Sequence, residues 1–358
     1  MNASPFKEGC VIANRGGIVE NSHYVHIAVV DSSGKLLRSV GNPNRVTLLR
    51  SAAKPAQAIA ILETGAFEKY GFNDEDLALM CASHNAEDIH LEQARSMLKK
   101  IEAKDDQLNC GGHPSISPKL NEQWIRDRVK LTPIYNNCSG KHTGMLAGAK
   151  ALESSTNDYH LLENQMQQRV KAVVEQLCGA SKEDVLWGID GCNLPAPAMP
   201  LHNMARIFSK IARAADEIDA STRASEIQRM QNMARVYNAM CHNPYLLGGD
   251  DRFCSELPRI YNGDIIGKVG ADGCYGIAIR SAQTRKLGTD GAVGVAIKVE
   301  DGNLQILYAA VVEALKQLEI GTKDEWDQLR RFHHPPRLNT MGFAIGKIEH
   351  AFQVYGTS

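Results

Sequence analysis

The stretch LLRSAAKPAQA, residues 48–58, places a serine and a lysine three positions apart, directly before a proline. Apolar residues precede it in VTLLR (46–50) and follow it in AQAIAIL (56–62). This pattern predicts that Ser51 and Lys54 lie at the start of a buried helix. Because burial disfavours the charged form of a lysine, Lys54 could act there as a base toward the Ser51 hydroxyl. The plainer interpretation is that Ser51 caps a helix and Lys54 lies on the surface.

The spacing S-x-x-K alone carries little information, because the chain contains it at least four times, at Ser4, Ser32, Ser51 and Ser96. The other three occurrences lie in a terminal tail, a hairpin turn and a charged amphipathic helix. Only the one at Ser51 lies between two apolar segments, and it is therefore the candidate for catalysis.

Two further motifs follow in order along the chain. Ser83-His84-Asn85 has the form S-x-N and follows the apolar run LALMCA, and Lys268-Val269-Gly270 has the form K-x-G at the end of a strand-like run. S-x-x-K, S-x-N and K-[ST]-G are the three elements of penicillin-recognising serine acylases, although valine here replaces the serine or threonine. A second cation, Lys268, would help to keep Lys54 uncharged, and the Ser83 hydroxyl could pass a proton to the leaving amine.

The order of the elements predicts an α/β fold of the α+β type, with one antiparallel sheet built from both ends of the chain. Strands are predicted at 24–31 and 35–41, joined at Gly34, and at 264–270, 274–281 and 291–300. We expect the sheet to come from about 10–45 and 264–300 plus a C-terminal segment, with a helical region at about 55–245, in one catalytic domain spanning 1–358. A Rossmann fold is excluded, because no G-x-G-x-x-G follows a first strand.

Composition argues against several kinds of partner. The 358 residues carry a net charge of −1, so neither nucleic acid nor an anionic membrane is expected to bind. The N-terminal MNASPFKEGC lacks the layout of a signal peptide, and LQILYAAVVEAL (304–315) is too short to span a bilayer, so a cytoplasmic location is expected.

The nine cysteines include no C-x-x-C pair. We expect the tandem His333-His334 to lie in a solvated loop.

A candidate metal site combines two glycine-rich segments. NNCSGKHTG (136–144) contributes Cys138, Lys141 and His142, and GIDGCNLPA (188–196) contributes Asp190 and Cys192. Thiolate, imidazole and carboxylate groups suit zinc, and by ligand chemistry His142 is a better candidate than Lys141. The alternative is that each loop carries an ordinary buried cysteine.

Taken together, the segments RSAAKP, CASHN, NNCSGKH, GIDGCNLP and GKVGADG resemble the rhizobial-type L-asparaginases of the asparaginase II family. This resemblance implies a fold similar to serine β-lactamases and serine-type glutaminases, hydrolysis of L-asparagine to aspartate and ammonia, and a homodimer. It also implies two serine–lysine pairs, Ser51 with Lys54 and Ser83 with Lys268.

The resemblance further implies a zinc ion held by Cys138, Lys141 and Cys192 beside the substrate pocket, where it would shape the pocket. Candidates for binding the charged ends of the substrate are Arg50, Asn85, Asp190 and His142. Three alternatives remain open. The chain could be another serine-type amidohydrolase (a glutaminase, or a β-lactam or peptide acylase), a zinc amidohydrolase in which metal-bound water attacks, or a non-catalytic zinc-binding or ligand-sensing domain.

Overall fold

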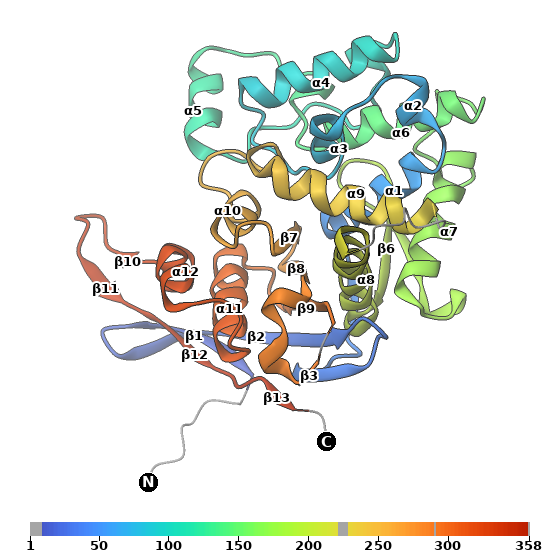
Figure 1. Ribbon diagram of the computed structural model, residues 1–358. Coiled ribbons are helices and arrows are strands. Elements are labelled where there is room, and N and C mark those ends of the chain that lie inside the picture. Colours follow the sequence, from blue (N-terminus) through green and yellow to red (C-terminus); the bar gives the residue numbers. More distant parts are fainter. Residues whose placement is uncertain (1–8, 221–227, 290, 357–358) are drawn as a thin grey trace.

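An antiparallel sheet of eight strands joins the two ends of the chain. The computed structural model describes residues 9–220, 228–289 and 291–356, and its sheet has the order β12-β1-β2-β9-β8-β7, with β3 paired to β2 and β13 paired to β3. Figure 1 shows the blue N-terminal strands beside the orange and red C-terminal ones. The strands are β1 (Cys10–Arg15), β2 (Ile18–Asp31), β3 (Leu36–Val40), β7 (Ile265–Gly270), β8 (Cys274–Ile279), β9 (Val293–Val299), β12 (Ile348–Ala351) and β13 (Tyr355–Gly356). This architecture confirms the predicted fold class.

The long strand β2 connects the two halves of the sheet. Its first residues pair with β1, and its later residues pair with β3 on one side and β9 on the other. The register with β9 runs from Val25 opposite Val299 to Asp31 opposite Val293. Residues more than 250 positions apart in the sequence are therefore held side by side by backbone hydrogen bonds.

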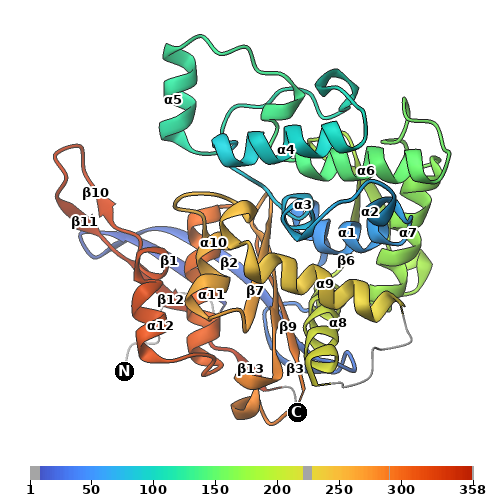
Figure 2. The same cartoon turned by 45° about the horizontal axis from the view of Figure 1, so that its top comes forward.

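Most helices come from the middle of the chain, as predicted. In Figure 2 they gather above the sheet, near its β7 edge. They are α1 (Lys54–Leu62), α2 (Ala66–Lys69), α3 (Asp74–Met80), α4 (Asp88–Lys100), α5 (Pro118–Arg126), α6 (Ser139–Ala151), α7 (Gln165–Cys178), α8 (Leu201–Ala220), α9 (Gln228–His242) and α10 (Phe253–Ile260). Three more follow the sheet strands, namely α11 (Leu304–Gln317), α12 (Lys323–Gln328) and α13 (Arg330–His333). Among the described residues, no helix combines the length and the apolar character needed to cross a bilayer.

Helices cover both faces of the central strands. On the face of α8, a Cβ atom at Gly294 would lie only 1.9 Å from the carbonyl oxygen of Ala205, so the helix backbone rests directly on the strand. On the opposite face, Tyr275 of β8 meets Tyr308 of α11 edge to face, with ring centroids 6.2 Å apart. Every residue of β8 and β9 is buried, which explains why these strands are apolar apart from Lys298.

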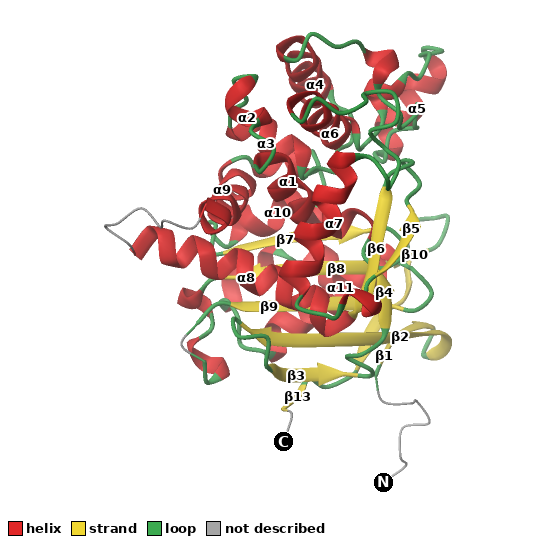
Figure 3. Cartoon of the chain, turned by 90° about the vertical axis from the view of Figure 1, so that its right-hand side faces the viewer, coloured by secondary structure: helices red, strands yellow, loops and turns green. Residues whose placement is uncertain are grey.

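A second, three-stranded sheet was not predicted. It consists of β4 (Val46–Leu48), β6 (Pro195–Pro200) and β5 (Leu186–Ile189), in that order, and Figure 3 shows β6 running across the direction of the main strands. The sequence of β6, PAPAMP, conceals it, because proline is depleted in strand interiors. This sheet leads the chain into Ser51 through β4 and carries the Asp190–Cys192 turn between β5 and β6.

The prediction of a solvated loop at His333-His334 was wrong for His333. This residue ends the short helix α13, is 5% exposed, and has its Nε2 2.8 Å from Glu313 Oε2. His334 is exposed. A short hairpin of β10 (Arg337–Leu338) and β11 (Ala344–Gly346) follows, before the chain returns to the sheet as β12.

Replacing Gly294 by alanine should destabilise the fold, because the added methyl group meets the backbone of α8 and the helix must move outward. We expect the free energy of unfolding, measured by urea denaturation, to fall by about 1–3 kcal/mol. Gly188→Ala is the matched control, since its Cβ would lie 3.7 Å from the nearest atom, an ordinary contact. Equal losses in the two variants would contradict the close packing of α8 on β9.

Candidate active site

Three of the four predicted catalytic residues meet at one point. The Ser83 hydroxyl lies 3.1 Å from Lys54 Nζ and 2.8 Å from Lys268 Nζ, and both amines donate to it. Lys54 also donates to the carbonyl oxygen of Ala82, and Lys268 to that of Val269. Both lysines are fully buried and Ser83 is 4% exposed. The structure therefore holds one hydroxyl between two amines in a place without bulk water.

Local structure explains how these residues reach each other. A 3₁₀ helix over Arg50–Ala53 runs directly into α1, with Lys54 and Pro55 in its first turn. Ser83 follows α3 and is fixed by its backbone N–H, which donates to Leu247. At the end of β7, a Cβ atom on Gly270 would lie 2.2 Å from the carbonyl oxygen of Leu49. The glycine of the K-x-G motif thus lets the strand that carries Lys268 approach the turn that carries Ser51.

Burial of Lys268 has a direct electrostatic consequence. Removal from water, helped by the positive charges of Lys54 and Arg252 and opposed by Cys254, lowers the pKa of this amine to about 7. Two cations in one dry site repel each other, so the site favours a neutral amine on Lys268 near neutral pH. A neutral amine has the lone pair that a general base needs.

Ser51, the fourth predicted catalytic residue, is half-buried at the start of the 3₁₀ helix. Among the residues that the structure describes, its hydroxyl has no hydrogen-bond partner, and Lys54 bonds to Ser83 instead. The residue before it, Arg50, has a φ of 51°, a left-handed conformation that costs a non-glycine residue free energy. The predicted Ser51–Lys54 pair is therefore three residues apart in the chain but not hydrogen-bonded.

The three predicted metal ligands also lie together. Lys141 Nζ is 3.1 Å from Cys192 Sγ, and the Cys138 thiol donates to the Cys192 sulfur. This hydrogen bond and the charge of Lys141 lower the pKa of Cys192 to about 5, although burial opposes ionisation. Burial disfavours the charge on Lys141, but Cys192, Cys138 and Asp190 outweigh it and raise the pKa of its ammonium group.

This donor set fits zinc. Two sulfurs and one nitrogen, all buried, converge on a small volume, and one sulfur is already favoured as a thiolate. Binding would have to release the protons of Cys138 and Lys141, since an ammonium group has no lone pair. Without a metal, the same groups form a thiolate–ammonium pair.

Arg50 and Asp190 connect the serine turn to the thiol cluster. Arg50 Nε donates to Asp190 Oδ1 at 2.6 Å, and its Nη1 donates to Asp272. Asp190 Oδ2 lies 3.9 Å from Lys141 Nζ. Burial would raise the pKa of Asp190, but Lys141 and Arg50 lower it to about 2. Of the predicted substrate-binding residues, these two are therefore already paired with each other.

The other two predicted substrate-binding residues are buried. Asn85 donates to Glu87 at 2.8 Å and accepts from Arg252 at 2.8 Å. His142 Nδ1 lies 2.7 Å from the Tyr159 hydroxyl, while its Nε2 has no partner among the described residues. Burial, followed by the charge of Lys141, lowers the pKa of His142 to about 3, so its imidazole is neutral at neutral pH.

Comparison with known proteins identifies the family. The sequence model described as L-asparaginase II matches residues 11–350, nearly the whole chain. The chain belongs to the L-asparaginase II family. Membership places it among the amidohydrolases. No curated protein sequence matches it significantly.

Among solved structures, the Bacillus subtilis glutaminase YbgJ, in covalent complex with 5-oxo-L-norleucine, overlaps 83% of this family member and 89% of its own chain, at 11% identity and a TM-score of 0.35. A probable glutaminase of Bacillus subtilis overlaps 78% of this chain and 82% of its own, at 13% identity and a TM-score of 0.32. A protein named Mglu overlaps 82% of this chain and 67% of its own, at 13% identity and a TM-score of 0.33. Overlaps of this quality support no conclusion about activity.

Arg252 and Cys254 touch the site of this L-asparaginase II family member, yet sequence reasoning missed both. Arg252 anchors Asn85 and its charge lowers the pKa of Lys268, while Cys254 Sγ accepts from the Val269 N–H at 3.3 Å. They lie in GGDDRFCSEL (248–257), which has the pattern of a common helix start. Only the proximity of this segment to β7 reveals its importance.

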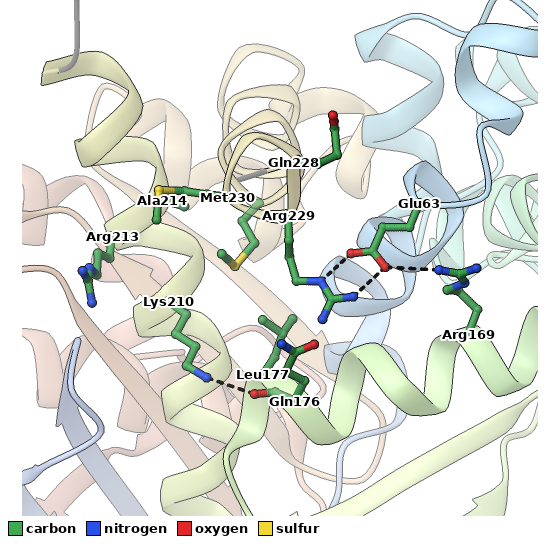
Figure 4. A pocket seen from close by; sticks show the side chains of 11 residues that line it. Glu63, Arg169, Gln176, Leu177, Lys210, Arg213, Ala214, Gln228, Arg229 and Met230 are labelled. Carbon is green, nitrogen blue, oxygen red and sulfur yellow. Dashed lines mark hydrogen bonds and ion pairs between the residues drawn. The ribbon is translucent and has the colours of Figure 1, made fainter. Parts of the chain in front are cut away.

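A cavity of about 680 Å³ lies away from all these residues, beside α1, α7, α8 and α9 (Figure 4). Its wall includes Glu63, which accepts from Arg229 Nη2 at 2.7 Å and lies 3.9 Å from Arg169. None of its lining residues belongs to the serine–lysine or thiol clusters.

Asp190→Asn should destabilise the protein at pH 7 by about 2 kcal/mol, because Arg50 and Lys141 lose their shared anion. The pKa of Asp190 is lower in the folded state than its ordinary 3.8, so this contribution is present above about pH 4 and is lost as the pH falls toward 2. Urea denaturation of parent and variant between pH 7 and pH 3 checks both points. Equal stability at pH 7 would show that the pair contributes nothing.

Proposed function

We propose that the protein hydrolyses the side-chain amide of L-asparagine to L-aspartate and ammonia through a serine nucleophile. One observation supports this most strongly: the Ser83 hydroxyl is held between two buried lysine amines, and the pKa of Lys268 is near 7. A hydroxyl becomes a nucleophile when a neighbouring base takes its proton, and a neutral lysine can be that base. Family membership supports the reaction class.

In this proposal Ser51 attacks the substrate. Its hydroxyl is half-buried and has no partner among the described residues, so a bound amide can approach it, whereas Ser83 is almost fully enclosed. Lys54 lies three residues further on, which is one turn of a 3₁₀ helix, and so lies on the same side as Ser51. Hydrogen bonds of a catalytic pair often tighten only when substrate binds.

The proton then moves along the cluster. Lys54 first passes one proton through Ser83 to neutral Lys268. It then accepts the Ser51 proton while the serine oxygen bonds to the amide carbon, and the carbonyl electrons move to oxygen. Ser83 contacts both amines and can pass a proton between Lys54 and Lys268. When the tetrahedral intermediate collapses, the nitrogen takes a proton from this cluster and leaves as ammonia. Water hydrolyses the resulting β-aspartyl ester by the same steps in reverse order.

The charged ends of asparagine need partners near Ser51. Arg50, the adjacent residue, presents a partly exposed guanidinium group that suits an α-carboxylate, and Asp190 suits an α-ammonium group. Asn85 and His142, the other two candidates, are buried, and their part in binding would be to position the residues that contact the substrate. Glutamine differs by one methylene, and such a difference is worth about 1–3 kcal/mol of discrimination.

Zinc would be held by Cys138, Lys141 and Cys192. When bound there, it would supply a fixed positive charge that shapes the pocket beside Asp190, since a serine already supplies the nucleophile. In the same place the protein's own residues keep Arg50 oriented through its ion pair with Asp190.

Ser51→Ala should reduce the release of ammonia from L-asparagine to background, because it removes the attacking oxygen. The measurement is coupled detection of ammonia, with zinc content determined alongside and expected to be unchanged. Ser96→Ala is a matched control, since Ser96 belongs to another S-x-x-K sequence but is exposed on α4. Full activity in Ser51→Ala would refute the proposed nucleophile.

A diazoketone analogue of asparagine separates the two serines. It should label the parent protein at Ser51, as determined by peptide mass spectrometry. Labelling at Ser83 instead would exchange the roles of the two hydroxyls. Parallel assays with L-glutamine and a chromogenic β-lactam test the neighbouring substrate classes.

Activity should rise with pH through about 7, because deprotonation of Lys268 creates the neutral base that the mechanism uses. A plot of log kcat/KM against pH should have a slope of one below this value. Lys268→Arg keeps the positive charge at every accessible pH and should lower kcat/KM by a factor of roughly 10²–10⁴. A wild-type profile that is flat between pH 5 and 9 would contradict the assignment.

Removal of the metal tests the zinc amidohydrolase alternative. If a serine attacks, protein stripped by a chelator and verified by metal analysis should retain measurable turnover. A complete loss that returns on adding zinc, with no covalent labelling of either serine, would favour attack by metal-bound water instead.

A further inference from the structure

A third cluster of metal-binding side chains lies far along the chain from the thiols. Glu313 of α11, His333 of α13 and His350 of β12 each point one possible ligand atom inward, and these atoms lie within 4.8 Å of one another. Glu313 Oε2 is 2.8 Å from His333 Nε2 and 3.8 Å from His350 Nδ1. The His333 and His350 rings stack with centroids 4.6 Å apart.

These distances suit a tetrahedral metal ion. With metal–ligand bonds of about 2.0–2.1 Å, the ligand atoms of a zinc site lie roughly 3.4 Å from one another. The Glu313–His350 separation is close to this value, and the Glu313–His333 separation needs to increase by only about half an ångström. Two imidazoles and one carboxylate are a common ligand set for zinc.

A buried nitrogen in the cluster lacks a partner. The side chain of His350 is 6% exposed, yet its Nε2 makes no hydrogen bond to any described residue. A buried polar atom without a partner is destabilising, so such an atom commonly indicates a missing ligand. Because Nδ1 faces Glu313 in the present orientation, a metal ion takes up Nε2 only when the ring turns toward the cluster.

The carboxylate is held in position from behind. Gln317 donates to Glu313 Oε1 at 2.8 Å, which leaves Oε2 directed toward the histidines. Gln317 also donates to the carbonyl oxygen of Phe352 and accepts from the Val354 N–H, both just after β12. Support of this kind, which fixes the direction of a ligand, is typical of metal sites.

We propose that Glu313, His333 and His350 bind a zinc ion that fastens the C-terminal strand to α11. The exposed His334, whose ring centroid lies 5.5 Å from that of His350, or a water molecule completes the coordination. Strand β12 forms the edge of the sheet against β1, with His350 opposite Val11. A metal there links β12 to α11 and α13 and stabilises the folded chain by its binding free energy.

The site is separate from the proposed chemistry. None of its ligands belongs to the thiol cluster or contacts the serine–lysine cluster among the interactions of the described residues. The inference therefore does not depend on the proposed function, and it can be tested without an activity assay.

The test uses the full chain with Cys138→Ser and Cys192→Ser, which removes the thiol donors. After chelation and dialysis, titration with Zn²⁺ alone should give about one equivalent bound. Adding Glu313→Gln or His350→Gln to this background should reduce binding to near zero, whereas His113→Gln, which changes an exposed histidine elsewhere, should leave it unchanged. Co²⁺ in place of zinc should show visible d–d absorption without a thiolate charge-transfer band.

Thermal unfolding gives a second readout. Free zinc at a hundredfold excess over Kd should raise the Tm of the Cys138→Ser, Cys192→Ser background by roughly 3 °C, and this shift should vanish with Glu313→Gln, which preserves the shape of the side chain. Absence of zinc binding in the folded background overturns the proposal. Unchanged binding in both glutamine variants overturns it equally.

Discussion

The structure depends on a hydroxyl held between two amines that water cannot reach. Lys54 and Lys268 both donate to Ser83, and both are fully buried. In bulk water two ammonium groups this close would each keep a proton, because solvent would screen their repulsion. Here burial, together with the neighbouring cation, lowers the pKa of Lys268 to about 7. The surrounding fold must therefore exclude water and hold three distant segments in fixed positions, and this requirement explains features that would otherwise seem unrelated.

The main sheet meets that requirement by joining the ends of the chain. Strand β7 is firmly placed because β8 and β9 link it to β2, and α8 and α11 enclose the central strands. Gly270 then lets β7 approach the backbone of Leu49, so that Lys268 comes to the start of α1. The smaller sheet of β4, β5 and β6 places the turn of Asp190 and Cys192 next to the same start, and Arg50 joins the two through its ion pair with Asp190. The strained φ of Arg50 fits a position that is fixed by contacts on several sides.

The sequence predicted the sheet and the convergence of Lys54, Ser83 and Lys268. Alternating and continuous apolar runs indicate which segments are buried, and the order of the three motifs indicates that they form one site. The sequence could not predict that Ser83, and not Ser51, accepts hydrogen bonds from both lysines, since that depends on the directions of side chains at the start of α1, after α3 and in β7. Prolines concealed β6, and the ordinary appearance of GGDDRFCSEL concealed Arg252 and Cys254. The tandem histidines were assigned to solvent because the partners of His333, namely Glu313 and His350, are distant in the sequence. Each of these predictions missed a feature that depends on tertiary contacts, which no local sequence pattern encodes.

The most direct test of this account is the titration of Lys268 itself. Carbon-13 NMR of lysine labelled at Cε, with the Lys268 resonance assigned by its absence in Lys268→Arg, reports the charge of this amine without reference to turnover. The account predicts a titration midpoint near pH 7 in the folded protein. A Lys268 amine that stays protonated up to pH 10 would contradict it, because the cluster would then contain no neutral base.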